Sequence, residues 1–257
     1  MKLNLKDKVV VITGGATGIG FEAAFEFLRE GCKVAICGRR QEKLDEAAAL
    51  FAKEGFSVLA RSVDVCDYAA FEAFGEEVHN TFGKIDIWLN NAAGNTIRSL
   101  VDFSVDEFCQ LMDLNLTSVF VGCKIAYRYM KGKGGVILNG SSFSALDPNA
   151  GRGVYSTAKA GILSLTSLFA AELAPDNIRV IAYVPGMIET PISERSRALY
   201  KDALLADIPM RRFGKPDEVA KLLVFLASDA ASYINGTHIT IAGGKRCVQN
   251  PHYAFNL

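Results

Sequence analysis

The sequence lacks the cysteine and histidine patterns that mark metal sites and disulfide-linked proteins. Its six cysteines form no Cys-x-x-Cys pair, and it contains only three histidines. Neither a zinc site nor a disulfide framework is therefore predicted. We expect free, mostly buried thiols in a reducing cytoplasm, and no metal in the functional site.

Long apolar runs and an excess of one charge are also absent. No stretch approaches the roughly 20 uninterrupted apolar residues of a membrane helix. The N-terminal segment 1–8 is too charged for a signal peptide. Basic and acidic residues number 28 each, so the formal net charge is zero. Surfaces that bind nucleic acid or anionic membranes normally need clustered excess lysine and arginine. The sequence thus predicts no binding to nucleic acid or membranes.

Short β-branched runs alternate with longer helical patterns along the whole chain, and half of the residues are hydrophobic. Strands are predicted over 8–13, 33–37, 57–63, 85–90, 135–139, 178–184 and 237–242. Helices are predicted over about 18–30, 41–54, 68–82, 105–131, 154–173 and 216–228. Strands joined by helical crossovers form parallel sheets covered on both faces. The predicted fold is α/β: one domain over 1–257 with a Rossmann-type, doubly wound parallel sheet of about seven strands.

The turn after the first predicted strand is rich in glycine, with Gly14, Gly18 and Gly20 in the segment 13–20. Glycines at such a turn let the backbone approach a pyrophosphate, and the helix that follows offers amide donors. The spacing, Gly-x-x-x-Gly-x-Gly, differs from the common Gly-x-Gly-x-x-Gly. Its place after the first strand of a doubly wound sheet favours dinucleotide binding over a tight turn without a ligand.

The end of the second strand bears on the choice of dinucleotide. A bare ribose 2′-hydroxyl is usually met there by an acidic residue, whereas a 2′-phosphate is met by a guanidinium. The acidic residue is missing, and Gly38 is followed by Arg39 and Arg40. NADP(H) is therefore the predicted cofactor, and NAD(H) is less favoured. The alternative is that both arginines only solvate the next helix.

Polar or Gly/Pro clusters follow the later strands as well. They are Asp64-Val65, Asn90–Gly94, Ser141-Ser142 and Pro185-Gly186. In an open parallel sheet, ligands bind beyond the carboxyl ends of the strands, so together these clusters outline one site.

Tyr155 and Lys159 lie four positions apart on the helix predicted over 154–173, so their side chains share one face. A positive charge near a phenol favours tyrosinate and lowers the pKa of the phenol. We therefore expect Lys159 to lower the pKa of Tyr155, which would let Tyr155 exchange a proton with a substrate oxygen near neutral pH.

Together these motifs resemble the short-chain dehydrogenase/reductase superfamily over 8–244. The matching segments are Thr13–Gly20, Asn90–Ala92, Leu114–Thr117, Ser142, Tyr155 with Lys159, Pro185-Gly186 with Thr190, Arg212–Ala220 and Phe225–Asp229. The resemblance implies an NADP(H)-dependent oxidoreductase that transfers a hydride between nicotinamide and a carbonyl or secondary alcohol. A 3-oxoacyl thioester, a ketone, a sugar or a steroid could provide that group.

The resemblance also implies roles for single residues. Tyr155 would be the general acid/base, and Ser142 would orient and polarise the substrate oxygen. Lys159 would hold the nicotinamide ribose and tune Tyr155, and Asn115 would support a water-linked proton relay. The residues predicted to line the cofactor are Gly14, Thr17, Gly18, Ile19, Gly20, Arg39, Arg40, Asp64, Val65, Asn91, Ala92, Tyr155, Lys159, Pro185, Gly186, Ile188 and Thr190.

Two departures from the family pattern keep alternatives open. Ala93 replaces a usual glycine, and the form Asn-Asn-Ala-Ala-Gly-Asn over 90–95 resembles the dienoyl-CoA reductase branch, which lacks a standard Tyr-x-x-x-Lys. Thr17 stands where NADP-preferring members often carry a basic residue. The alternatives are an enoyl- or dienoyl-thioester reductase and a non-catalytic NADP-binding regulatory protein. The intact set of implied catalytic residues argues against the second.

The remaining predictions concern the substrate side and assembly. Apolar residues alternate with charges over 187–212, which predicts a lid with an apolar inner face closing on a partly apolar substrate. Ordinary surface helices are the alternative there. The tail, 245–257, either frays or docks on a neighbouring subunit or over the site. The resemblance implies a homo-oligomer, a tetramer formed through the helices over 105–131 and 154–173 and the last strand.

Overall fold

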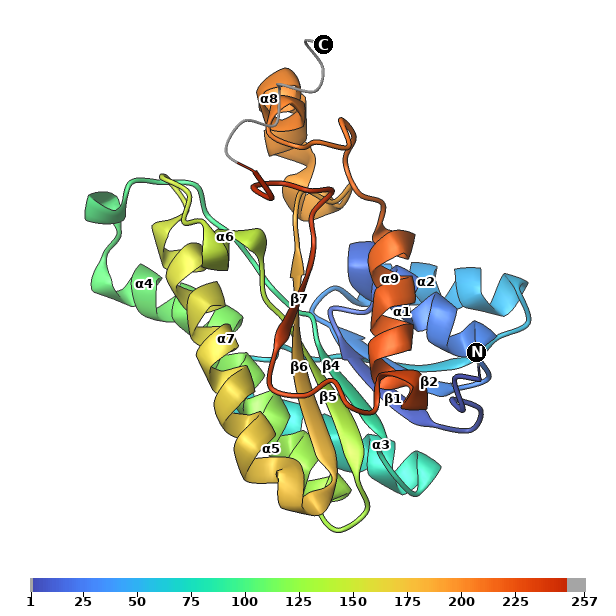
Figure 1. Cartoon of the computed structure of the whole chain (residues 1–257). Coiled ribbons are helices and arrows are strands. Elements are labelled where there is room, and N and C mark those ends of the chain that lie inside the picture. Colours follow the sequence, from blue (N-terminus) through green and yellow to red (C-terminus); the bar gives the residue numbers. More distant parts are fainter. Residues whose placement is uncertain (1, 249–257) are drawn as a thin grey trace.

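Seven parallel strands form one sheet in the order β3-β2-β1-β4-β5-β6-β7 (Figure 1). The computed structural model describes residues 2–248. The strands are β1 (Val9–Thr13), β2 (Lys33–Gly38), β3 (Val58–Ser62), β4 (Ile87–Asn90), β5 (Gly135–Gly140), β6 (Ile178–Pro185) and β7 (His238–Ile241). Each lies within two residues of its predicted bounds. The order reverses between β1 and β4, which creates the switch point where ligands bind in such sheets.

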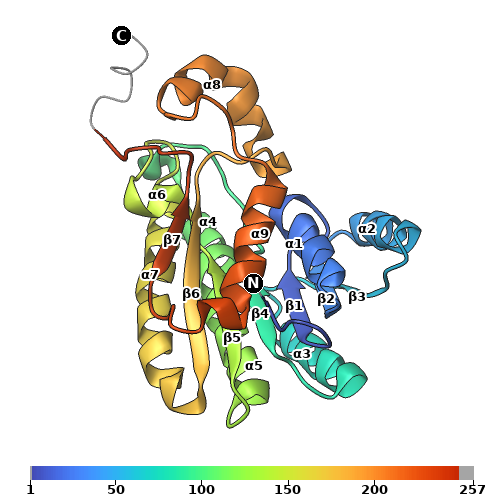
Figure 2. The same ribbon diagram turned by 45° about the vertical axis from the view of Figure 1, so that its right-hand side comes forward.

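Helices cover both faces of the sheet, as predicted (Figures 1 and 2). They are α1 (Gly18–Arg29), α2 (Gln41–Lys53), α3 (Tyr68–Phe82), α4 (Val105–Met112), α5 (Ser118–Met130), α6 (Phe143–Leu146), α7 (Gly153–Leu173), α8 (Glu194–Ala206) and α9 (Pro216–Ala227). Successive side chains of β1 point to opposite faces. Val10 and Ile12 pack with α1, α2 and α9, whereas Val9 and Val11 pack with α3, α5 and α7. Burial on both faces explains the uninterrupted apolar run in β1.

The helix predicted over 105–131 is interrupted by a π-helical turn, Asp113–Thr117, between α4 and α5. Side chains bond to backbone carbonyls here: Asn115 Nδ2 donates to Leu111 O at 2.9 Å, and Ser118 Oγ to Leu114 O at 2.7 Å. Such local bonds compete with the regular helical pattern, and π-turns often mark functional sites. The extent of this helical region was predicted; the turn was not.

No helix or strand was assigned between the predicted elements 178–184 and 216–228, but this segment contains the helix α8, so the assignment there was wrong. Helix α8 lies beyond the carboxyl ends of the strands and is kinked at Tyr200. Ser196 is its buried residue. A helix without an apolar stripe facing the core leaves no helical periodicity in the sequence.

The tail predicted to fray or dock falls largely on 249–257, outside the described residues. Within the described part of the chain, no helix has the length and apolar character needed to cross a membrane. The six thiols are free; Cys32, Cys37 and Cys123 are buried, whereas Cys109 and Cys247 are exposed.

Candidate active site

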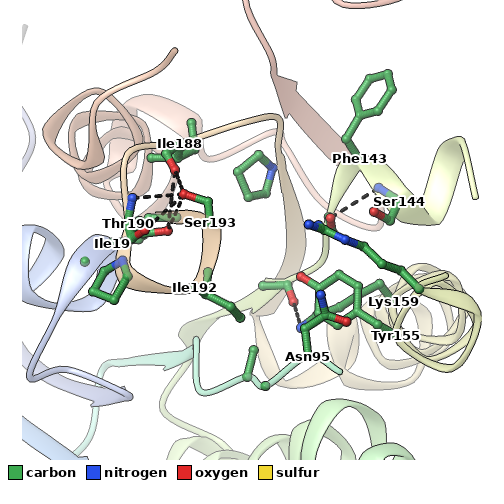
Figure 3. A pocket seen from close by; sticks show the side chains of 18 of the residues that line it. Ile19, Asn95, Phe143, Ser144, Tyr155, Lys159, Ile188, Thr190, Ile192 and Ser193 are labelled. Carbon is green, nitrogen blue, oxygen red and sulfur yellow. Dashed lines mark hydrogen bonds between the residues drawn. The ribbon is translucent and has the colours of Figure 1, made fainter. Parts of the chain in front are cut away.

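A cavity of about 1170 Å³ lies along the carboxyl edge of the sheet. All predicted site residues except Gly20 and Asn115 line it. Figure 3 shows Tyr155 and Lys159 on one side of this space and Ile19, Ile188 and Thr190 on the other. The structure thus brings the predicted cofactor residues and three of the four predicted catalytic residues to one cavity.

The glycine turn forms a cradle that side chains would fill. Gly14 has a φ of +66°, and a Cβ at Gly20 would lie 2.2 Å from the Gly14 carbonyl oxygen. Thr17, the N-cap of α1, makes no side-chain capping bond, and the first turn of α1 carries no acidic residue. Amide donors at such a helix start suit a phosphate group, so these residues fit a dinucleotide pyrophosphate.

Asn91 ties the ends of three strands together behind this turn. Its Nδ2 donates to the carbonyl oxygens of Thr13 and Gly14 at 3.0 and 3.1 Å. Its Oδ1 accepts from the Tyr183 hydroxyl at 3.0 Å. The Thr13 hydroxyl in turn accepts from the backbone amides of Asn91 and Ala92 at 2.9 and 3.0 Å. Sequence reasoning missed Tyr183, because a tyrosine in a buried strand usually reports packing.

Basic residues gather where β2 ends. Arg39, Arg40 and Lys43 line this part of the cavity. Arg39 is paired loosely with Asp64, at 3.9 Å, and both side chains are exposed. A Cβ at Gly38 would meet nothing within 4 Å. The strand end therefore offers open space beside three positive charges. Lys43 was not predicted; it lies one helical turn beyond the two arginines, a spacing that could have indicated it.

Ser142, Tyr155 and Lys159 meet at the ends of β5 and α7. The Ser142 side chain faces the Tyr155 phenol closely enough to lower its pKa as a hydrogen-bond partner. Lys159 is 2% exposed, and its Nζ donates to the Gly140 carbonyl oxygen at 2.7 Å. That nitrogen lies 5.6 Å from the centre of the Tyr155 ring. The strand end thus loops back to face the helix.

The electrostatics of this group differ from expectation. Burial raises the pKa of Tyr155, although the bond with Ser142 and the charge of Arg152 act in the opposite direction. Burial lowers the pKa of Lys159 to about 7. The expectation that Lys159 lowers the pKa of Tyr155 is therefore wrong. The cause is desolvation, which disfavours the charged form of both groups.

Sequence and structure comparisons agree with this geometry. Residues 14–246 match the sequence model of the family described as enoyl-(acyl carrier protein) reductase. The chain belongs to the short-chain dehydrogenase/reductase family. It is 36% identical to the 3alpha-hydroxysteroid dehydrogenase of Mediterraneibacter gnavus, covering 96% of this chain and 100% of that protein. It is 38% identical to the 3-oxoacyl-[acyl-carrier-protein] reductase of Thermotoga maritima, covering 94% and 99%.

A solved short-chain type dehydrogenase/reductase from Mycobacterium marinum superposes with a TM-score of 0.92 at 34% identity, covering 96% of this chain and 98% of that one. The protein is accordingly an enzyme of an oxidoreductase family that uses a nicotinamide cofactor. Among the described residues, no group of three or more His, Cys, Asp or Glu side chains could hold a metal ion.

The low pKa of Lys159 in this short-chain dehydrogenase/reductase has a consequence for stability. An unfolded lysine titrates near 10.5, and the folded one at about 7. Between these pH values the unfolded chain binds more protons, so stability rises with pH. We expect Lys159→Met to remove this rise. At pH 6 it should raise the melting temperature by about 2–8 °C, because about 1–2 kcal/mol of relieved burial cost shifts a chain of this size by about 2–4 °C per kcal/mol.

Thermal unfolding of both proteins from pH 6 to pH 10 measures this effect, with the exposed Lys133→Met as control. Parallel pH profiles for the parent and Lys159→Met would show that Lys159 is charged in the folded protein throughout.

Asn115 is the predicted catalytic residue that the cavity does not include. It is fully buried in the π-helical turn, and its Oδ1 accepts from the Gly94 backbone amide at 3.2 Å. With Nδ2 bonded to Leu111, both ends of the side-chain amide are engaged. The structure shows Asn115 joining α4 to the loop after β4, and its relay role stays a prediction.

Sequence reasoning missed most of the substrate side of the cavity. Its walls come from α6 and the segment before α7, from α8 and the residues before it, and from the segment after β7. Ile192 and Leu204 belong to the predicted lid; the lining residues that were missed include Phe143, Arg152, Ser196 and Lys245. None follows a strand directly, and none belongs to a family motif. Phe143 and Arg152 could have been predicted from the sequence, because they lie between Ser142 and Tyr155.

Proposed function

We propose that this enzyme uses NADP(H) to transfer a hydride between nicotinamide and a carbonyl or secondary alcohol. The observation that supports this most is that Ser142 and Tyr155 lie together beside the buried Lys159. These groups line the same cavity as the glycine turn. A proton donor, an oxygen-polarising hydroxyl and a cradle for pyrophosphate are the parts that carbonyl reduction requires.

NADP(H), when bound, supplies or accepts the hydride. Ser142 donates a hydrogen bond to the substrate oxygen, where negative charge forms during reduction. Tyr155 stays protonated at neutral pH because burial raises its pKa, and it donates its phenolic proton to that oxygen. Lys159 lies beside Tyr155 and would hold the ribose when the cofactor is bound. The protonated phenol is the form that reduction requires.

The preference for NADP(H) rests on the end of β2. Arg39, Arg40 and Lys43 surround open space beside Gly38, where an acidic residue would otherwise meet a ribose hydroxyl. A guanidinium group can donate two parallel hydrogen bonds to phosphate oxygens, so this cluster suits a 2′-phosphate.

Helix α8 and the residues flanking it, over 187–212, form the proposed lid. Ile192 and Leu204 line the cavity, as do Ile97 and Phe143. Of the other apolar residues of the predicted inner face, Ile188 and Ile208 are buried, whereas Leu199 is 61% exposed. The lid therefore presents only part of that face to the cavity. It suits a substrate that is partly apolar, and the names of the relatives are consistent with an oxoacyl or hydroxysteroid substrate.

A second candidate function is reduction of an enoyl or dienoyl thioester. It is favoured by the description of the matching family and by the sequence Asn-Asn-Ala-Ala-Gly-Asn over 90–95. Gly94 packs tightly in this segment, since a Cβ there would lie 2.7 Å from the Leu114 side chain. The shifted glycine is thus accommodated by close contact with the π-helical turn.

NADPH consumption with matched substrates tests the two functions. The panel contains 3-oxoacyl thioesters, simple ketones and trans-2-enoyl thioesters of equal chain length. We expect consumption with C=O substrates and none with C=C substrates. The reverse would establish the second candidate. Tight NADPH binding without consumption in any reaction would support a non-catalytic, regulatory protein.

We also propose a homotetramer, in line with the family resemblance. Phe120 of α5 and Leu168 of α7 are 40% and 56% exposed, and β7 lies at an open edge of the sheet. These are the elements through which many family members associate. A cytoplasmic location remains a prediction from the cysteine spacing.

A further inference from the structure

Arg152 connects helix α7 with helix α8 on the substrate side of the cavity. It is the N-cap residue of α7, three residues before Tyr155, and it lines the cavity. Its Nη2 donates to the Ser196 hydroxyl of α8, and Ser196 is 4% exposed. The guanidinium thus joins the start of the catalytic helix to the proposed lid.

The cavity as a whole is basic, although the formal net charge of the chain is zero. Seven basic and three acidic side chains line it. Each acid has a basic partner: Asp64 with Arg39 at 3.9 Å, Asp147 with Arg246 at 2.7 Å, and Asp207 with Lys245 at 4.0 Å. Across residues 2–248, no carboxylate lies within ion-pair distance of Arg152. A positive charge without an acidic partner therefore remains on the substrate side.

The chemistry of arginine indicates what would balance this charge. A guanidinium has five N–H donors in a planar fork, and a single hydroxyl satisfies only one of them. Carboxylate and phosphate oxygens match that fork with two parallel bonds. Arg152 and Tyr155 line the same cavity, so both can contact one small molecule bound there. The charge of Arg152 reaches the phenol, because it lowers the pKa of Tyr155 against the larger effect of burial.

We propose that Arg152 binds an oxyanion group of the substrate, a carboxylate or a phosphate, a few bonds from the carbon whose oxygen faces Tyr155. This rests on the proposed function. The substrate class is then an oxo acid or hydroxy acid, or the corresponding phosphate ester. Its apolar part lies against Ile192 and Leu204, and the anion lies between α7 and α8. The lid closes on a charged substrate through Arg152, which already contacts Ser196.

Matched charged and neutral substrates test the assignment. The pairs are acetoacetate with methyl acetoacetate, and dihydroxyacetone phosphate with dihydroxyacetone. In the parent, kcat/KM with NADPH should be higher for at least one charged member. Arg152→Met should lower that value by about 10- to 100-fold, chiefly through KM, as expected for a lost charged hydrogen bond. It should change the neutral member less than about threefold, on the same scale, because that bond is absent.

Two further variants sharpen this experiment. Arg152→Lys keeps the charge without the fork and should recover part of the activity on the charged substrate. Arg195→Met, which removes an exposed arginine of α8, should leave the charged-to-neutral ratio unchanged. An equal loss on both members of each pair in Arg152→Met would mean that Arg152 only clamps α8, and would overturn the proposal while the proposed function stands.

Calorimetric titration with malonate, dimethyl malonate and inorganic phosphate measures binding without turnover. The parent should bind malonate or phosphate but not the diester, and Arg152→Met should lose that binding. The preferred anion identifies the group as carboxylate or phosphate. If no carbonyl is reduced but an anion binds through Arg152, the subsite stands and the proposed function falls. Absence of both anion binding and charge preference overturns the subsite.

Discussion

Tyr155→Phe is expected to lower kcat/KM for carbonyl reduction by about 10²- to 10⁴-fold, the usual contribution of a positioned proton donor. The substitution removes one hydroxyl and keeps the ring between Ser142 and Lys159. Binding of NADPH should stay within about threefold of the parent, because a lost neutral hydrogen bond is worth little. Steady-state kinetics and fluorescence titration with NADPH measure the two quantities separately.

Tyr233→Phe is the matched control, since Tyr233 is fully exposed and does not line the cavity. It should behave as the parent does. Retention of more than a tenth of the activity in Tyr155→Phe would show that another group donates the proton.

Gly38→Asp combined with Arg39→Ala is expected to shift the NADPH/NADH ratio of kcat/KM by about 100-fold or more toward NADH. Loss of a charged hydrogen bond to a 2′-phosphate accounts for about 1.5–3 kcal/mol, and the new carboxylate repels that phosphate while accepting a bond from a ribose hydroxyl. The aspartate fits, because a Cβ at Gly38 meets nothing within 4 Å.

The ratio is measured with one substrate and both cofactors. Lys53→Ala, at the far end of α2, serves as control and should leave the ratio unchanged. An unchanged ratio in the double variant would contradict the assignment of Arg39 and Arg40 to the cofactor phosphate.

The sheet was predictable because its strands have a strong local signal. Val9–Ile12 is apolar at every position, as burial on both faces requires, and the glycines at 14, 18 and 20 mark the turn that follows. The cofactor side of the site was predictable for the same reason: its residues lie directly after strands.

The substrate side was not predictable in this way. Helix α8 has one buried residue, Ser196, so its sequence lacks the apolar stripe from which a helix is predicted. The π-helical turn around Asn115 depends on side-chain bonds to carbonyls four residues back, which helix periodicity does not encode. The pKa of Lys159 depends on burial by the whole fold, and neighbouring residues alone suggested the opposite effect on Tyr155. The position of Arg152 between α7 and α8 depends on its hydrogen bond to Ser196, which lies 44 residues away in the chain.

Deuterium transfer is the most direct test of the central claim, that this cavity reduces a carbonyl at Tyr155. The parent enzyme is incubated with NADPH deuterated at C4 of nicotinamide, in each of its two diastereomers, and with the carbonyl and enoyl panel. Mass spectrometry then locates the label. The account predicts one deuterium on the carbinol carbon, from one diastereomer only, and about 10²- to 10⁴-fold slower labelling with Tyr155→Phe. Deuterium on a former C=C carbon, or bound NADPH that labels no product, would contradict it.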